Sequence, residues 1–274
     1  MLSVLKEVIT NFVAMVLHFK KIQACGNDFV IFNGIRVQGL NFQAEEIQKV
    51  CHRKFGIGAD GIIVIQSSEN HDFKVDYYNS DGSTSFCGNG ARASVLFANL
   101  SGIPITTFSF EGYDGIHNFK IHQDQIGISM MDVNAPDILS SHDAFINTGS
   151  PHHIRCSDDL SEQHILSVGF KLRHDPRYAP NGTNVNLMKH IDDRKVAIAT
   201  YERGVEDETL SCGTGAVASA LFHAHRNALQ HGPIQVSTKG GTLKVEFDYA
   251  KEFFQNIWLW GPALEVFEGV YEWK

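Results

Sequence analysis

Two cysteines stand in nearly the same sequence setting. The residues that follow Cys87 and those that follow Cys212 share the frame Cys-Gly-x-Gly-Ala-x-Ala-Ser-x-Leu-Phe. Weaker matches precede the two copies in the same order: Gly26 with Gly149, and Gly58 with Gly182. A long-period repeat of this kind predicts two similar halves. Each half then carries one cysteine at the beginning of a helix.

The glycines on either side of Asn89 and of Thr214 predict tight turns whose backbone N–H groups point the same way. The Ala-x-Ala-Ser-x-Leu-Phe run that follows is typical of a helix with one apolar side. A helix N-terminus carries partial positive charge and unpaired N–H donors, and it therefore attracts an anion. The same field lowers the pKa of a thiol from about 8.5 to roughly 3.5–7.5. We therefore expect each half to supply a reactive sulfur and a site for a carboxylate.

Two such sulfurs on opposite sides of a small molecule form an acid–base pair. One thiolate takes a proton from a carbon, the opposite thiol delivers a proton to the other face, and the stereocentre is inverted. The alternative is that each cysteine is only a small buried hydrophobe. The matching glycine flanks of Cys87 and Cys212 favour the chemical role.

Other polar residues stand in turns beside predicted strands. Asn27 lies in the turn between two such strands, and Asn79 either caps its own turn or reaches a ligand. His152 follows Gly-Ser-Pro, where it serves either the turn geometry or proton transfer beside a thiol. Glu202 and Arg203 end a predicted strand. They either form a structural ion pair or bind the ammonium and the carboxylate of an amino acid.

The two copies of the frame differ at one charged position. Arg92 in the first copy corresponds to Val217 in the second. Charged side chains are rarely buried unless they are paired. We therefore expect Arg92 to form an ion pair between the two halves.

The sequence argues against two common kinds of site, a dinucleotide-binding site and a metal site. Residues 56–61 match the letters G-x-G-x-x-G, but a predicted helix precedes them and a predicted strand follows, which reverses the order in dinucleotide-binding turns. Among the 14 histidines, His223 and His225 lie two apart on a predicted helix and face different directions. No Cys/His ligand spacing appears elsewhere. We expect neither a nucleotide cofactor nor a metal.

Composition narrows the class of protein. The 274 residues suffice for one large domain or two of ordinary size. The formal net charge of -8 and the absence of basic runs argue against a nucleic-acid partner. Five cysteines without CxxC spacing predict free thiols in the reducing cytoplasm. No apolar run reaches the roughly 18 residues that span a membrane, and we assign no role to an N-terminal extension, 1–16.

Several segments together resemble the diaminopimelate epimerase family: 26–29, 56–61, 79–83, 87–92, 149–152, 202–204 and 212–216. The resemblance implies an α/β (α+β) fold of two pseudo-symmetric domains, each a curled, mainly antiparallel β-sheet around a central helix, with the active site between them. We place the domain limits at 17–129 plus 262–274, and at 130–261. The resemblance also implies interconversion of LL- and meso-diaminopimelate, in lysine and peptidoglycan precursor synthesis, without pyridoxal phosphate or another cofactor.

The same resemblance implies roles for individual residues. Cys87 and Cys212 match the acid–base pair, and His152 and Glu202 match groups that assist the thiols. The positions that match substrate contacts are Asn27, Asn79, Gly88, Asn89, Asn184, Glu202, Arg203, Gly213 and Thr214. Gly61 stands where glutamine is frequent in the family, and Ser150 where asparagine is frequent. The implied ligand is a small amino acid, and a homodimer is compatible with the sequence.

Three other functions remain open at this point. A related proline or hydroxyproline racemase would keep both thiols but lack contacts for a second amino-acid end. A thiol redox protein would also carry two reactive cysteines, although the Cys-Gly-x-Gly setting differs from CxxC. A non-catalytic binding module would hold the amino acid without exchanging its proton.

Overall fold

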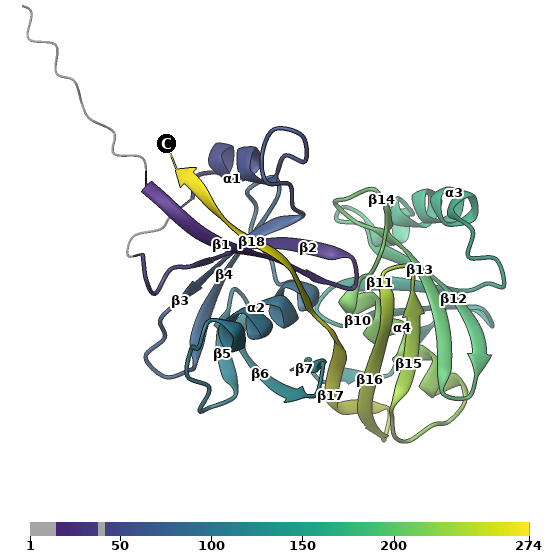
Figure 1. Ribbon diagram of the computed structural model, residues 1–274. Helices are drawn as coiled ribbons and strands as arrows, with labels where there is room; N and C mark the ends of the chain where they lie inside the picture. Colours follow the sequence, from purple (N-terminus) through teal and green to yellow (C-terminus); the bar gives the residue numbers. More distant parts are fainter. Residues whose placement is uncertain (1–14, 38–41, 274) are drawn as a thin grey trace, which may run out of the picture.

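The computed structural model describes residues 15–37 and 42–273, which form two lobes side by side (Figure 1). Residues 1–14 of the expected extension lie outside the described residues. Met15 and Val16 already belong to the first strand, β1 (Met15–Ala24). The chain ends on β18 (Leu264–Trp273), which returns to the first lobe and pairs antiparallel with β1.

The first lobe is a sheet with one helix on each face. Residues alternate between the two faces of a strand, so β3 (Gly61–Gln66) buries Ile62 and Val64 on the side of α1 and Ile63 and Ile65 on the side of α2. The other elements of this lobe are β2 (Asn27–Asn33), α1 (Ala44–Cys51), β4 (Phe73–Asn79), α2 (Gly88–Leu100) and β5 (Ser109–Gly112).

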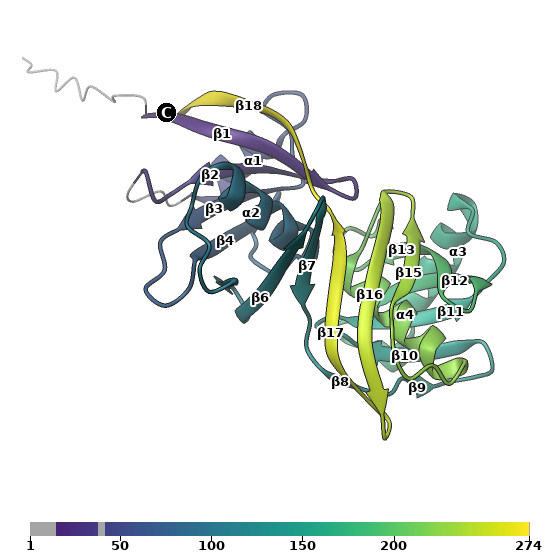
Figure 2. The same cartoon turned by 60° about the horizontal axis from the view of Figure 1, so that its bottom comes forward.

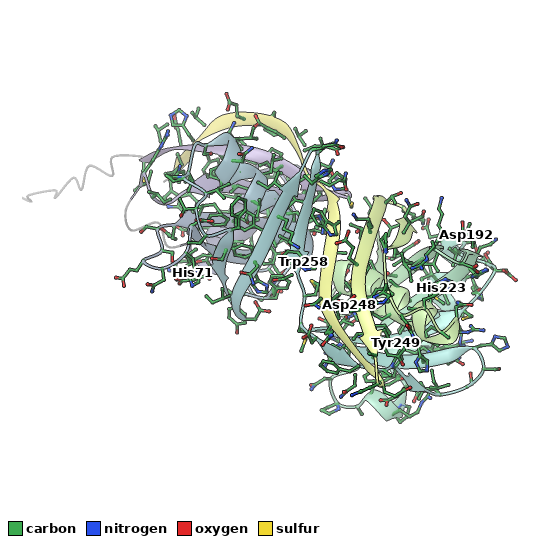
Figure 3. The ribbon with its side chains drawn as sticks, turned by 90° about the horizontal axis from the view of Figure 1, so that it is seen from below. His71, Asp192, His223, Asp248, Tyr249 and Trp258 are labelled. Carbon is green, nitrogen blue, oxygen red and sulfur yellow. The ribbon has the colours of Figure 1, made fainter. Side chains whose placement is uncertain are left out.

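The second lobe has the same layering. β12 (Asn184–Asp192) turns Val185 and Leu187 towards α3 and Met188 towards α4. Figure 3 marks His223 of α4 and Tyr249 of β16 in this lobe. Its other elements are β8 (Val133–Asn134), β9 (Asp137–Ile138), β10 (Asp143–Asn147), β11 (Pro151–Cys156), α3 (Glu162–Arg173), a 3-10 turn (Pro176–Tyr178), β13 (Lys195–Glu202), β14 (Asp207–Thr209), α4 (Gly213–Arg226), β15 (Ile234–Thr238), β16 (Gly241–Ala250) and β17 (Phe253–Pro262).

The two lobes repeat one topology. β2 and β3 pair in parallel, as β11 and β12 do, and each pair is joined through a helix, α1 or α3. β4 and β5 also pair in parallel, as β13 and β15 do, with α2 or α4 in the connection. The remaining ladders are antiparallel. This repetition agrees with the repeated sequence frame.

Helices α2 and α4 lie at the centre of their lobes. Their alanine-rich sequences let sheet strands approach from several sides, and most of their residues are buried. A helix that is apolar nearly all round belongs in a core. This packing holds the N-terminus of each helix in place, and with it the cysteine that precedes the helix.

Two strands connect the lobes. β6 (Gly115–His122) pairs with β5 and with β7 (Gln125–Ser129), and β7 pairs with β17 (Figure 2). The apolar cores stay separate: Ile128 of β7 packs in the cluster around α2, and Leu259 of β17 packs in the cluster around α4. On this division we propose the domain limits given above, 17–129 plus 262–274 and 130–261, with Met15 and Val16 added to the first domain because they belong to β1.

Candidate active site

The N-termini of α2 and α4 meet between the lobes. Cys87 and Cys212 are the N-cap residues of these helices, each with extended backbone. A Cβ atom added to Gly213 would lie 3.8 Å from Cα of Gly88. The Asn89 side chain crosses the junction, because its Nδ2 donates a 3.2 Å hydrogen bond to the backbone oxygen of the residue before Cys212. The structure thus brings the two cysteine motifs together.

Hydrogen bonds join Cys87 directly to Asn27, and through Asn27 to Asn89, both of them predicted contact residues. Its Sγ donates to Oδ1 of Asn27 at 3.5 Å and accepts from the backbone N–H of Gly90 at 3.4 Å. Asn27 is held in turn, because its Nδ2 donates to Asp60 at 2.6 Å and its Oδ1 also accepts from Asn89 at 3.4 Å. Asn27, Asn89 and Cys87 therefore form one cluster.

Cys212 faces a different set of groups. Its Sγ lies 3.5 Å from Oγ1 of Thr214, which lies 2.9 Å from Nε2 of His152. Nδ1 of His152 lies 2.8 Å from Oδ1 of Asn186. Asn186 donates its Nδ2 to Thr200 at 2.8 Å, which leaves Oδ1 facing the histidine. A chain of hydrogen bonds therefore leads from the second sulfur to a buried imidazole.

The network assigns the tautomer of His152. Asn186 offers only an oxygen, so Nδ1 of the imidazole carries the proton and Nε2 accepts the hydroxyl proton of Thr214. The Thr214 oxygen is then free to accept from the Cys212 thiol. Burial lowers the pKa of His152 to about 4, so the imidazole is neutral at pH 7 and able to accept a proton.

The thiol pKa values differ from the sequence prediction. The helix N-termini were expected to lower them, but burial raises the pKa of Cys87 to about 11 and raises that of Cys212 as well. The negative charge of Glu202 adds to both increases. Backbone N–H groups of Asn89 and Gly90 oppose the rise at Cys87 without cancelling it. Desolvation of the thiolate outweighs the helix field, and both sulfurs are thiols in this state.

Glu202 is the last residue of β13, and Arg203 follows it beside Asn184. Burial raises the pKa of Glu202, since no cation compensates its charge. The backbone N–H of Arg203 donates to Oδ1 of Asn184 at 2.8 Å, and Nδ2 of Asn184 donates to the oxygen of Pro151 at 3.2 Å. In residues 15–37 and 42–273 no ion pair joins Glu202 to Arg203. The structural ion pair considered from the sequence is therefore not formed.

Asn79 is joined to the cluster through other residues. Its Oδ1 accepts a 2.8 Å hydrogen bond from the Tyr77 hydroxyl, and its Nδ2 donates to Oγ of Ser85 at 3.2 Å. Tyr77 and Ser85 line a small cavity together with Cys87. The Tyr77 ring also occupies the space beside Gly61, where an added Cβ would meet the ring at 2.6 Å. A side chain at position 61 would displace this tyrosine.

Two residues of the site, Tyr77 and Asn186, were not predicted. Each stands two positions from a predicted residue on the same strand, Tyr77 before Asn79 on β4 and Asn186 after Asn184 on β12. Residues two apart on a strand face the same side of a sheet. Both residues could therefore have been predicted from their two-residue spacing from Asn79 and Asn184.

The ion pair expected for Arg92 is also not formed. Its guanidinium is fully buried and donates to the backbone oxygen of Gly88 and to Oδ1 of Asn89, both in its own helix. Within the described part of the chain, no carboxylate lies at ion-pair distance from it. The expectation was wrong because the guanidinium reaches back along α2.

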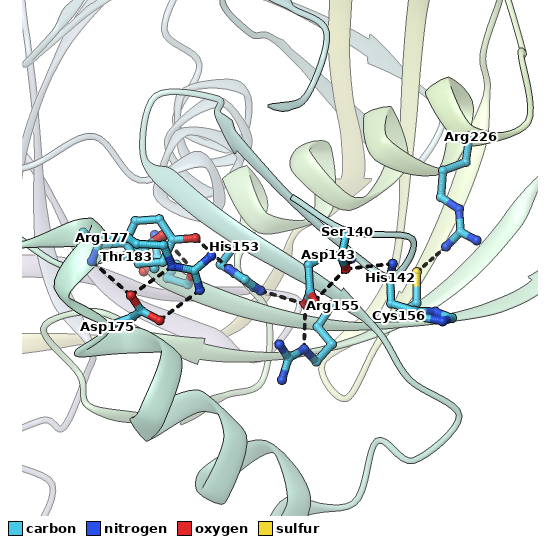
Figure 4. A network of polar contacts seen from close by, with 12 residues as sticks. Ser140, His142, Asp143, His153, Arg155, Cys156, Asp175, Arg177, Thr183 and Arg226 are labelled. Carbon is cyan, nitrogen blue, oxygen red and sulfur yellow. Dashed lines mark hydrogen bonds and ion pairs between the residues drawn. The ribbon is translucent and has the colours of Figure 1, made fainter. Parts of the chain in front are cut away.

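His153 faces the opposite side of β11 from His152, as neighbours on a strand do. Its ring bonds Asp143 at 2.9 Å and the Tyr178 hydroxyl at 2.7 Å, and Arg155 donates to the same carboxylate (Figure 4). This network is structural.

Among the residues that the structure describes, no group of three or more His, Cys, Asp or Glu side chains is placed to hold a metal ion. None of the described helices has both the length and the apolar content needed to cross a membrane.

Comparison with known proteins agrees with this geometry. A sequence model of the family described as Diaminopimelate epimerase matches residues 19–135 and 144–256. The diaminopimelate epimerase of Flavobacterium psychrophilum is 42% identical over 251 residues, covering 90% of this chain and 97% of that protein. The diaminopimelate epimerase of Chlorobaculum tepidum is 37% identical over 256 residues, covering 89% and 97%.

Solved structures share the fold at low identity. A Bacillus anthracis phenazine biosynthesis protein of the PhzF family has a TM-score of 0.69 at 15% identity, covering 94% of this chain and 99% of that one. A hydroxyproline epimerase from Agrobacterium vitis has a TM-score of 0.67 at 11% identity, covering 94% and 92%. These likenesses confirm the predicted two-domain α+β fold. Since the family model matches most of the sequence, and relatives above 30% identity cover nearly all of it, this chain belongs to the diaminopimelate epimerase family.

Proposed function

We propose that the protein is an isomerase that interconverts LL- and meso-diaminopimelate by exchanging the proton at one α-carbon between two cysteines, without a cofactor. This is the activity named for the relatives that cover nearly the whole chain, and it serves lysine biosynthesis. The observation that carries the proposal is the meeting of two cysteine-capped helix N-termini between the lobes.

In this proposal Cys87 and Cys212 are the catalytic acid and base. One of them, as a thiolate, removes the α-proton, and the other, as a thiol, protonates the opposite face of the same carbon. The C–H bond breaks on one side as a new C–H bond forms on the other. Positioned acid–base groups supply about 10²–10⁴ in rate. His152 takes part through Thr214, by accepting or returning the Cys212 proton.

The two helix N-termini bind the α-carboxylate. The backbone N–H groups of Gly88, Asn89, Gly213 and Thr214 belong to the first turns of α2 and α4, where donors have no partner within the helix. The same donors stabilise the negative charge that develops on the carboxylate as the α-proton leaves. A preorganised donor of this kind contributes about 10²–10³ in rate.

Glu202 binds the α-ammonium, and this contact activates the thiols. In the free protein the carboxylate of Glu202 raises the pKa of both cysteines. A substrate ammonium that pairs with Glu202 cancels this charge, so thiolate formation becomes easier when the substrate is present. Asn27 contacts the substrate beside Cys87, to which it is hydrogen-bonded. Asn79, Asn184 and Arg203 hold the distal amino-acid end, which a proline-type substrate lacks.

We also propose that two copies associate through the ribbon of β1 and β18. Val16, Val266 and Val270 on this ribbon are 55%, 57% and 59% exposed. A cluster of exposed apolar side chains on an antiparallel ribbon is typical of an interface. Val270→Lys should then lower the mass measured by light scattering after gel filtration, and an unchanged mass contradicts the dimer.

The five free thiols support a cytoplasmic location.

The test is incubation of LL-diaminopimelate with the purified protein in deuterated water, with isomers separated by chromatography and examined by mass spectrometry. The initial meso product should carry one deuterium at the inverted carbon, while unreacted LL substrate stays largely protonated. Rapid labelling of the substrate pool contradicts the two-cysteine scheme. Absence of any meso product contradicts the function itself.

Matched variants and substrates sharpen this test. Cys212→Ala should abolish epimerisation, whereas Cys51→Ala, which alters the buried last residue of α1, should retain it. L-proline and trans-4-hydroxy-L-proline should not be racemised. Racemisation of either would identify the related activity instead.

A further inference from the structure

Arg92 is a buried cation for which residues 15–37 and 42–273 provide no anion. Among the side chains of these residues it is the largest that is fully buried, at 0% exposure. Nη2 donates to Oδ1 of Asn89 at 2.5 Å and Nη1 donates to the backbone oxygen of Gly88 at 3.3 Å, while Nε has no hydrogen-bond partner. Burial lowers the pKa of Arg92, but a guanidinium in a protein does not lose its proton. The charge therefore remains within the first turn of α2.

The fold does not require this arginine. The equivalent position in the second copy of the frame is Val217, also at 0% exposure, and α4 forms the same central helix there. An uncompensated buried charge is costly, and an apolar residue of similar volume usually stabilises a core better. Arg92 therefore lowers the stability of the core, and its presence is better explained by a role in function than by a role in folding.

The neighbours of Arg92 lead to the active site. Because Arg92 occupies Oδ1 of Asn89, the Asn89 Nδ2 faces the backbone oxygen of Ser211 and Oδ1 of Asn27, and the same Asn27 oxygen accepts a hydrogen bond from the Cys87 thiol. The cation also opposes the rise in the pKa of Cys87. The charge that acts on Cys212 is instead that of Glu202, which raises its pKa. At the position of Arg92, the second copy of the frame carries the uncharged Val217.

Gly261 and Cys25 complete the surroundings of the guanidinium. A Cβ added to Gly261 would lie 3.1 Å from Nε of Arg92, so the glycine leaves room for the side chain. The Cys25 thiol lies beside it: burial raises the pKa of Cys25, and Arg92 opposes this rise. Neither neighbour supplies a negative charge at neutral pH.

We propose that Arg92 is a positioning residue whose buried charge is compensated by the substrate's α-carboxylate, and which acts through Asn89 and the first turn of α2. This inference rests on the proposed function, since the carboxylate is bound at that turn. The cation is set in place before the substrate arrives, so it needs no reorganisation as charge develops on the carboxylate.

The test compares Arg92→Met, which removes the charge, with Arg92→Lys, which keeps it, and with Val217→Ala as the matched control in the second copy. We expect Arg92→Met to lower kcat by about 10²–10³-fold, with a much smaller change in KM, because the cation acts most strongly on developing charge. Arg92→Lys should recover at least about a tenth of the wild-type kcat. Val217→Ala should leave kcat within about threefold of wild type.

A pH profile separates this role from a structural one. Loss of the cation raises the pKa of Cys87, so the acid limb of kcat/KM should move to higher pH in Arg92→Met and stay in place in Arg92→Lys. A merely structural residue would lower the amount of active enzyme without moving the limb. Folded Arg92→Met with wild-type kcat, or a reduced kcat with an unmoved limb, overturns the proposal.

Two further measurements cover the remaining cases. If Arg92→Met does not fold, Arg92→Lys decides: a kcat well below about a tenth of wild type overturns the proposal. If the wild type does not epimerise diaminopimelate, the proposed function fails separately, and alkylation of Cys87 by iodoacetamide tests the cation. Alkylation at a fixed pH should be slower in Arg92→Met than in Arg92→Lys, and equal rates refute the inference.

Discussion

Cys87 and Cys212 occupy equivalent positions in the repeat, yet their neighbours differ. Cys87 faces an asparagine and the field of Arg92, whereas Cys212 faces the Thr214 hydroxyl and, beyond it, a neutral imidazole. The first sulfur is therefore placed to hold negative charge, and the second to pass on its proton. The two half-reactions are expected to respond differently to mutation.

Thr214 provides the first test at this scale. Thr214→Val removes the hydroxyl between Cys212 and His152, so the second thiol loses its proton path. We expect kcat to fall by about 10²-fold, within the range of acid–base catalysis. Thr214→Ser keeps the hydroxyl and should stay within about tenfold of wild type. Equal activities of the Val and Ser variants, measured in both reaction directions, would contradict the relay.

The raised thiol pKa values set the pH dependence. With the pKa of Cys87 at about 11 in the free protein, the thiolate becomes scarcer as pH falls. We expect kcat/KM to rise by about tenfold per pH unit between pH 7 and 9, because this ratio reports ionisation of the free enzyme. Initial rates at low substrate concentration measure it. A rate independent of pH in this window would show that the thiolate is already present.

At the scale of elements, the first turns of α2 and α4 differ in how closely neighbouring side chains approach the backbone. Gly90 of α2 and Gly215 of α4 stand at equivalent positions, but their surroundings differ. A Cβ on Gly215 would lie 2.5 Å from Nδ2 of Asn186 and 3.3 Å from the His152 ring. A Cβ on Gly90 would meet only ordinary contacts, at 3.4 Å or more.

Alanine substitutions at these two glycines should therefore diverge. Gly215→Ala must displace Asn186 and His152, and it should lower the free energy of unfolding by about 1–3 kcal/mol. Gly90→Ala fits and gains helix propensity, so it should change stability by less than about 1 kcal/mol in either direction. Urea denaturation compares them. Similar losses in the two variants would show that α4 adapts to the added methyl group.

At the scale of the whole molecule, the site exists only where the lobes meet. Each lobe contributes one sulfur, and Asn89 of the first lobe donates to the backbone beside Cys212 of the second. Exclusion of water from this junction strengthens the dipoles of both helices. Any change that fixes or separates the lobes should act on catalysis.

Oxidation tests this arrangement. Oxidised glutathione, itself reduced to two thiols, should accept the electrons as Cys87 and Cys212 lose their protons and form one disulfide between the lobes. Activity should disappear and return with dithiothreitol, and peptide mass spectrometry should identify the cross-link. Cys51→Ala should behave like wild type. An inactivated sample with both active-site thiols free would contradict their proximity.

The sequence by itself determined the features that depend on neighbouring residues. The repeated Cys-Gly-x-Gly frame predicted two cysteine-capped helices, because capping and helix periodicity are local properties. The family resemblance, together with the repeat, pointed to Asn27, Asn89, His152 and Thr214 as site residues. In the structure, hydrogen bonds join Asn27 to Cys87 and Thr214 to Cys212, and further bonds lead from these two residues to Asn89 and His152. The turn of Asn79 was predicted as well, although its link through Tyr77 was not.

The tertiary structure decided what depends on burial and on distant segments. The thiol pKa values rise rather than fall, because desolvation depends on everything packed around the sulfur. Arg92 has no ion-pair partner among the described residues, and only the packed helix shows that its guanidinium turns back to Asn89. The return of β18 to pair with β1 joins the first and last described strands, and no local pattern encodes a contact over that separation.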